Sequence, residues 1–135
     1  MSSVSIQAVS RVFETAKGQR TQALQPVDFE VKDNDFVTIL GPSGCGKSTL
    51  LRIVAGLDHA TSGRVLLDGV PVEGPGADRG MVFQSYTLFP WLTIEQNIRF
   101  GLRERGMPEA QQKERAAYFI AKVGLRGFEP VSYTH

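Results

Sequence analysis

Nine consecutive residues in the first half of the chain combine the residue types that bind a triphosphate. They are Gly41, Pro42, Ser43, Gly44, Cys45, Gly46, Lys47, Ser48 and Thr49. Glycines let the backbone wrap closely around an anion with its N–H groups pointing inward, and a following helix adds its positive end. Lys47 supplies a charge for the β and γ phosphates, and the Ser48 hydroxyl is placed to ligate Mg²⁺. The spacing of a glycine, four residues, Gly-Lys and then Ser or Thr therefore predicts a phosphate-binding loop.

The residues on either side of the loop predict a strand before it and a helix after it. Residues 36–40 are nearly all apolar, which is typical of a strand covered on both faces of an α/β sheet. Residues 48–55 contain good helix formers, and Gly56 gives the expected stop signal. The order strand, loop, helix is the arrangement in which such a loop binds phosphate.

Cys45 is the only cysteine, so no internal disulfide can form and the sequence favours a cytosolic protein. A reactive thiol is conceivable because Lys47 and a helix start lie close to it. The favoured interpretation is that a small residue fits in the loop and that its backbone N–H contacts the anion.

Further strands are predicted on both sides of this region. Residues 4–12 and 27–31 read as strands, and residues 63–72 as a hairpin that turns at Asp68-Gly69, a dipeptide that tolerates positive φ. Another short apolar strand is predicted at 80–84.

Two helices are predicted in the last third of the chain. Thr93 and Gln96 have the spacing of a capping box, and Pro108 opens the second helix. In that helix four apolar residues fall on one face and predict one buried stripe, made of Ala116, Phe119, Ile120 and Val123.

Composition bounds the kinds of partner that the chain can have. The length of 135 residues predicts one domain or most of one. Hydrophobic residues make up 41% and charged residues 21%, as in ordinary globular proteins, which disfavours a disordered or a membrane protein. Fifteen basic and fourteen acidic residues leave a net charge of +1, so no nucleic acid partner is expected. The sequence predicts neither an export signal nor a membrane span.

Three segments of the chain closely resemble the nucleotide-binding subunits of ABC transporters. They are residues 41–57, 61–69 and 81–102, and the resemblance as a whole covers residues 4–129. It implies an α/β fold of the P-loop NTPase class, with an N-terminal antiparallel β region and the start of a helical subdomain. It also implies that the loop binds ATP with Mg²⁺.

The resemblance assigns roles to two residues outside the phosphate loop. Gln84 occupies the position whose glutamine contacts Mg²⁺ and the attacking water, so Gln84 and Lys47 are the predicted catalytic residues, and Gln84 and Ser48 the predicted metal ligands. From the residue alone, without the flanking motifs, Gln84 would be read as a polar residue at a strand end. Phe13 matches an aromatic, commonly a tyrosine, that stacks on adenine, although a core phenylalanine is an equal alternative on sequence grounds.

Two loops resemble more particularly the subunits that serve nitrate, sulfonate and taurine importers. They are residues 72–80 and 88–91. The second contains Phe89, Pro90 and Trp91, and if exposed this cluster would suit docking of a helix from a membrane partner. The alternative from the residues alone is a Gly/Pro loop followed by an aromatic surface turn. The resemblance implies transmembrane permease subunits, a second copy of the chain and, indirectly, a periplasmic solute-binding protein as partners. It places the protein in the cytoplasm, at the inner face of the membrane.

The family's later motifs are not found in the chain. These are the signature sequence, the Walker B strand and the switch histidine, so we expect residues 1–129 to be a truncated domain that binds nucleotide weakly and hydrolyses it poorly. Residues 130–135 resemble a translated sequencing adapter and are expected to be a non-native tail. Two alternatives remain open, a soluble ABC-type ATPase in translation or DNA repair, and a non-catalytic nucleotide-binding module.

Overall fold

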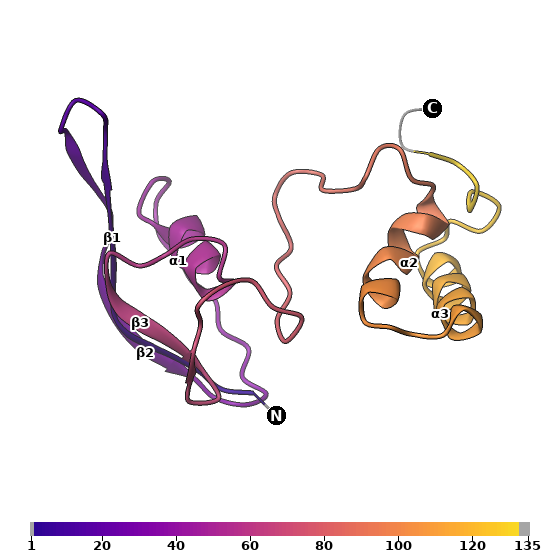
Figure 1. Cartoon of the computed structure of the whole chain (residues 1–135), viewed down its shortest axis with the longest axis horizontal. Coiled ribbons are helices and arrows are strands. Elements are labelled where there is room, and N and C mark those ends of the chain that lie inside the picture. Colours follow the sequence, from indigo (N-terminus) through magenta and orange to yellow (C-terminus); the bar gives the residue numbers. More distant parts are fainter. Residues whose placement is uncertain (1, 133–135) are drawn as a thin grey trace. The chain divides into compact units, whose positions relative to one another are not determined.

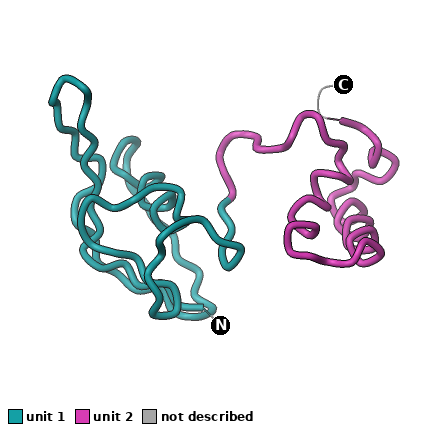
Figure 2. Tube along the Cα trace, in the orientation of Figure 1, with its two compact units in different colours: residues 1–81 teal, residues 82–135 magenta. Residues whose placement is uncertain are grey.

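The computed structural model describes residues 2–132 and divides the chain into two compact units. The first unit ends at Met81 and contains a sheet, the phosphate loop and one helix (Figure 1, Figure 2). The second unit begins at Val82 and contains two helices. Among the described helices none is long and apolar enough to cross a membrane.

The sheet of the first unit is antiparallel and has four strands in the order β2-β1-β3-β4. Its strands are β1 (Val4–Glu14), β2 (Arg20–Val31), β3 (Ser62–Leu67) and β4 (Val70–Pro71). This arrangement confirms the predicted antiparallel β region. The strand predicted at 27–31 is longer in the structure, because the ladder with β1 continues to the pair Glu14 and Arg20.

The hairpin between β3 and β4 turns where the sequence predicts. Asp68 and Gly69 have φ angles of 51° and 81°, the positive values that a type I′ turn requires at both central positions. The predicted hairpin at 63–72 is therefore confirmed.

Helix α1 (Lys47–Val54) packs on the sheet and closes the core of the first unit (Figure 1). Gly56 follows with φ 76°, as expected for a glycine that ends a helix. The core joins residues of β1, β2, α1 and β3, namely Ile6, Val9, Leu24, Leu50, Ile53 and Val65. Each such side chain contributes about 1.5–3 kcal/mol on burial, which fixes α1 and the loop before it against the sheet.

The strands predicted at 36–40 and 80–84 are not formed, and these predictions are wrong for this structure. Phe36 is 95% exposed and Val82 97% exposed, and of residues 36–40 only Ile39 packs against the core. A strand forms when a neighbour accepts and donates its backbone hydrogen bonds. Within residues 2–132 no strand pairs with either segment, so their apolar sequence alone does not make them strands.

The second unit is a pair of packed helices, α2 (Ile94–Glu104) and α3 (Glu109–Lys122). The predicted capping box is present, since the Thr93 side chain accepts from the Gln96 N–H and the Gln96 side chain accepts from the Thr93 N–H. Pro108 is the N-cap residue of α3, as its sequence position suggests.

The predicted buried stripe of α3 is only half right. Ala116 and Ile120 are buried, but Phe119 and Val123 are exposed. Gln112 takes the next place along the buried line, at i−4 from Ala116, and its amide donates to the Met107 carbonyl over 2.7 Å. A polar residue can be buried there because this bond satisfies it.

Charged residues at the start of α3 join it to α2. Arg99 of α2 pairs with Glu109, and Lys113 does the same from the next turn of α3. The hydrogen bond and charge of Lys113, followed by those of Arg99, lower the pKa of Glu109 below its usual range.

Part of the expected tail contacts the second unit. The Ile94 N–H donates to the Val131 carbonyl over 3.0 Å, and Ser132 forms a bridge with Thr93. Residues 133–135 lie outside the described residues, and the non-native origin of 130–135 stays a prediction.

Candidate functional site

The phosphate loop enters α1 through two glycines with left-handed backbones. Gly44 and Gly46 have φ angles of 80° and 97°, which side-chain-bearing residues adopt at a cost. A Cβ on Gly46 would lie 2.5 Å from the Ala23 carbonyl oxygen and 3.0 Å from Leu24 Cδ1, so the end of the loop lies directly on β2. The backbone of the loop is thus close to the sheet, while residues 41–45 are exposed.

Lys47 folds back over the loop. Its Nζ donates to the carbonyls of Gly41 and Pro42 at 2.5 and 2.7 Å, and lies 3.5 Å from the Cys45 Sγ. An ammonium has three donors and no acceptor, and it turns on a flexible stem. Lys47 is therefore placed where it can exchange the two carbonyls for phosphate oxygens at the mouth of the loop.

The start of α1 suits an anion. Gly46 is the N-cap, no side chain caps the first turn, and the first turn contains no acidic residue. The first N–H groups of a helix lack intrahelical partners, and they carry the positive end of the helix dipole. Ser48 is exposed in this first turn, and Thr49 beside it is half-buried.

The donor set of the loop fits a triphosphate with Mg²⁺. Residues 41–49 offer backbone N–H groups, one ammonium and three hydroxyls, and they contain no carboxylate that would repel phosphate. Magnesium prefers oxygen ligands and keeps several waters, so one hydroxyl from Ser48 together with phosphate oxygens matches its requirements.

Cys45 is exposed, and its side chain turns toward Gly41. A Cβ on Gly41 would lie only 2.6 Å from the Cys45 Sγ, so the thiol fits because Gly41 has no side chain. The packing agrees with the interpretation of Cys45 as a small residue that the loop accommodates, while a reactive-thiol role stays a prediction.

Phe13 lies on β1 with 43% of its surface exposed and the Arg11 guanidinium 4.5 Å from its ring centroid. It is therefore not a core residue of the first unit. An exposed ring can offer its π face to a flat base. The role of Phe13 toward adenine stays a prediction.

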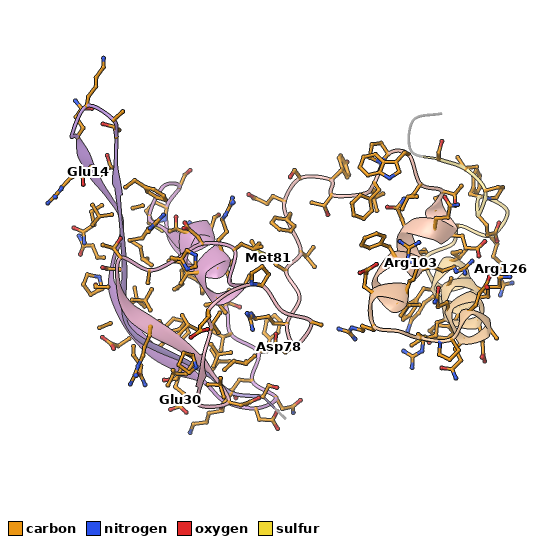
Figure 3. All side chains as sticks on the ribbon, viewed as in Figure 1. Glu14, Glu30, Asp78, Met81, Arg103 and Arg126 are labelled. Atoms are coloured by element: carbon orange, nitrogen blue, oxygen red, sulfur yellow. The ribbon has the colours of Figure 1, made fainter. Side chains whose placement is uncertain are left out.

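Gln84 belongs to the second unit, which begins directly after Met81, a residue labelled in Figure 3. Its side chain is exposed, and it lies in an irregular stretch rather than at the end of the predicted strand. Its predicted contact with Mg²⁺ and with the attacking water stays a prediction.

The aromatic residues after Gln84 form a cluster before and within α2. The Phe89 ring lies 5.3 Å from that of Trp91 and 4.6 Å from that of Phe100. Trp91 itself is exposed. The sequence indicates Phe89 and Trp91 as neighbours, whereas the place of Phe100 beside them depends on the path of the chain into α2.

Asn97 holds this cluster in place. Its Oδ1 accepts from the Phe89 N–H at 2.8 Å, and its Nδ2 lies within hydrogen-bonding distance of the carbonyls of Phe89, Leu92 and Thr93. The amide thus satisfies the backbone of the turn that leads into α2. No pattern in the sequence distinguishes it from a surface asparagine.

The comparisons with known proteins agree with this geometry. The family model described as ABC transporter matches residues 24–134. An uncharacterized ABC transporter ATP-binding protein of Methanocaldococcus jannaschii is 54% identical over 124 residues, which are 92% of this chain and 46% of that protein. The nitrate import ATP-binding protein NrtD of Synechocystis is 48% identical over 120 residues, 89% of this chain and 45% of that protein.

A taurine import ATP-binding protein, TauB of Burkholderia pseudomallei, is 48% identical over 129 residues, 96% of this chain and 49% of that protein. The chain spans about half the length of the curated relatives it matches. Among solved structures, the cassette MJ0796, a dimer in a post-hydrolysis state with ADP and Pi, matches with a TM-score of 0.83 at 28% identity. That match covers 97% of this chain and 62% of the cassette, and confirms the predicted α/β fold of an ABC-type nucleotide-binding domain. Since the family model covers most of its residues, the chain belongs to the ABC transporter family.

Proposed function

We propose that this chain is part of the ATP-binding subunit of an import system, and that residues 41–49 bind ATP with Mg²⁺. The observation that carries the proposal is the uncapped start of α1, with Gly46 pressed on β2 and Lys47 folded over the loop. This arrangement gathers amide donors, a helix end and an ammonium at one place, which is what a triphosphate requires.

Each predicted residue has a defined task in this proposal. Gly41, Gly44 and Gly46 keep the loop free of side-chain bulk, and Lys47 neutralises charge on the β and γ phosphates. Ser48 provides an oxygen ligand to Mg²⁺, which neutralises further charge when it is bound. Phe13 stacks on the adenine, and Gln84 orients the attacking water.

Hydrolysis and transport are proposed for the complete protein, because its relatives are about twice as long as this chain. The importer assignment is supported by relatives whose names specify nitrate and taurine import. We propose two kinds of partner. One is a second copy of the subunit, as in the dimeric cassette. The other is the transmembrane permease subunits, which the protein would contact at the inner face of the membrane. Those import relatives do not favour the alternative role in translation or DNA repair.

Isothermal titration calorimetry of the chain with Mg·ATP tests the proposal. Replacing Lys47 with alanine should weaken ATP binding about 10- to 100-fold, because hydrogen bonds to charged groups contribute about 1.5–3 kcal/mol. Lys17→Ala is the matched control, since Lys17 is an exposed lysine in the turn between β1 and β2. Unchanged ATP affinity in a folded Lys47→Ala variant would refute the proposed site.

A further inference from the structure

Arg11 on β1 contacts both Asp58, in the segment after α1, and Phe13, the residue proposed to stack on adenine. Its guanidinium pairs with the Asp58 carboxylate over 2.9 Å and lies 4.5 Å from the centroid of the Phe13 ring. The Arg11 side chain is only 24% exposed, and its Nε is buried without a hydrogen-bond partner in the described part of the chain. A guanidinium held this closely by one carboxylate and one ring has little freedom to leave them.

Asp58 lies in the segment that follows α1. Its Oδ1 also accepts from the His59 N–H over 2.8 Å. The next residues run along β1, because the Thr61 N–H donates to the Ser10 carbonyl and the Val12 N–H donates to the Thr61 Oγ1. The carboxylate that holds Arg11 is therefore itself held.

The same part of β1 is linked to the phosphate loop. Arg11 is paired across the sheet with Leu24, and Leu24 is the residue on which Gly46 packs. The start of α1 thus packs against this stretch of the strand pair at Leu24, and the segment that follows α1 is joined to the same stretch by the ion pair of Arg11 and Asp58.

Phe13 is two residues beyond Arg11 on β1, past an irregularity in the pairing of β1 with β2, and the Arg11 guanidinium lies over its ring. One face of its ring carries the guanidinium, while 43% of the residue remains exposed. A cation on one face draws electron density toward itself, and it also restricts how the ring can turn. Both effects favour stacking of an electron-rich base on the exposed part of the ring.

We propose that Arg11 is a positioning residue for the base of the nucleotide: held by Asp58, it holds the Phe13 ring at a set place relative to the phosphate loop. This inference rests on the proposed function, since it assumes that the loop binds the triphosphate. It adds a specific consequence. The contribution of the base to the affinity for ATP depends on Arg11, whereas the contribution of the phosphates does not.

Comparison of two ligands separates these contributions. The dissociation constants of Mg·ATP and of Mg·tripolyphosphate, which has no base, are measured for the wild-type chain and for Arg11→Ala. A cation–π contact of ordinary strength corresponds to about a two- to fivefold loss of ATP affinity, with the tripolyphosphate affinity unchanged. Arg20→Ala is the matched control, because Arg20 is an exposed arginine of the same unit that pairs with the exposed Glu14.

Two further variants identify the route of the effect. In a Phe13→Ala background, Arg11→Ala should cause no additional loss of ATP affinity, because Arg11 acts through the ring. Asp58→Asn, which removes the charge but keeps an oxygen acceptor, should lower ATP affinity less than Arg11→Ala and in the same direction. If Arg11→Ala does not fold, Asp58→Asn alone provides the comparison of the two ligands.

Three results would count against the inference. Equal losses for ATP and tripolyphosphate would give Arg11 a structural role only, and an unchanged ATP affinity in folded Arg11→Ala and Asp58→Asn would give it no role in binding. Full additivity with Phe13→Ala would show that Arg11 does not act through the ring. Failure of the wild-type chain to bind either ligand would instead overturn the proposed function, and this inference with it.

Discussion

At the scale of single residues, Gly46 is where the phosphate loop comes closest to the sheet. A Cβ there would lie 2.5 Å from the Ala23 carbonyl oxygen, a backbone atom that cannot move without disturbing β2. The residue also has φ 97°, which costs a residue with a side chain about 1–2 kcal/mol. Position 46 therefore requires glycine for two independent reasons.

We expect Gly46→Ala to lower the free energy of unfolding by about 2–5 kcal/mol, the sum of left-handed strain and overpacking. ATP binding should weaken as well, because the start of α1 must shift. Urea unfolding followed by circular dichroism measures the stability, and calorimetry measures the binding.

Gly44→Ala is the matched control for that prediction. Gly44 has a similar φ of 80°, but a Cβ there would meet no atom within 4 Å. Its loss of stability should be limited to the strain, about 1–2 kcal/mol. Equal losses in the two variants would mean that the contact with Ala23 does not constrain the loop.

At the scale of elements, Asn97 joins the first turn of α2 to the turn before it. Its amide makes all of its bonds to backbone groups, including the N–H and carbonyl of Phe89. The turn that carries Phe89 and Trp91 thus depends on one side chain of the helix that follows.

Asn97→Ala should lower the free energy of unfolding of the second unit by about 1–3 kcal/mol, because the half-buried Phe89 N–H loses its acceptor. The fluorescence of Trp91, the only tryptophan, should change at the same time. Gln111→Ala is the control, an exposed amide on α3 whose removal should change stability by less than about 0.5 kcal/mol. A loss as small as the control's would show that the turn does not need Asn97.

Elements with local signals could be predicted from the sequence. The turn at Asp68 and Gly69 requires positive φ, and the capping box of α2 requires Thr93 and Gln96 at their spacing, so neighbouring residues decide both. Residues 36–40 have an equally strong pattern, but a strand also needs a partner, and a pattern cannot supply one. For the same reason the sequence predicts only residues 27–31 of β2, because pairing with β1 extends the strand back to Arg20.

In the candidate site, too, local features could be predicted from the sequence and contacts between distant residues could not. The phosphate loop is contiguous, so its spacing alone predicts which residues meet the anion. The contacts of Arg11 depend on the register of β1 with β2 and on the path of the chain after α1. Both depend on the tertiary structure, so no pattern in the sequence indicates that Arg11 and Asp58 form an ion pair.

At the scale of the whole molecule, the exposed apolar residues of 36–40 should govern its behaviour in solution. Phe36 and Leu40 are 95% and 87% exposed, whereas Ile39 between them packs against the core. A short apolar segment of high β-propensity with unpaired backbone groups readily pairs with a second chain. Association of the chain with itself is therefore expected to begin here.

Phe36→Lys should slow this association without lowering the melting temperature, because the ring contributes almost nothing to the packed core and a charge opposes strand pairing. Light scattering over time measures the association, and circular dichroism measures the melting. Ile39→Lys is the matched comparison, since the same charge placed three residues later enters a half-buried site and should unfold much of the first unit. If Phe36→Lys unfolded the chain as readily as Ile39→Lys, the ring would be buried in solution and the segment would be a strand after all, because only a packed Phe36 could make its replacement so costly.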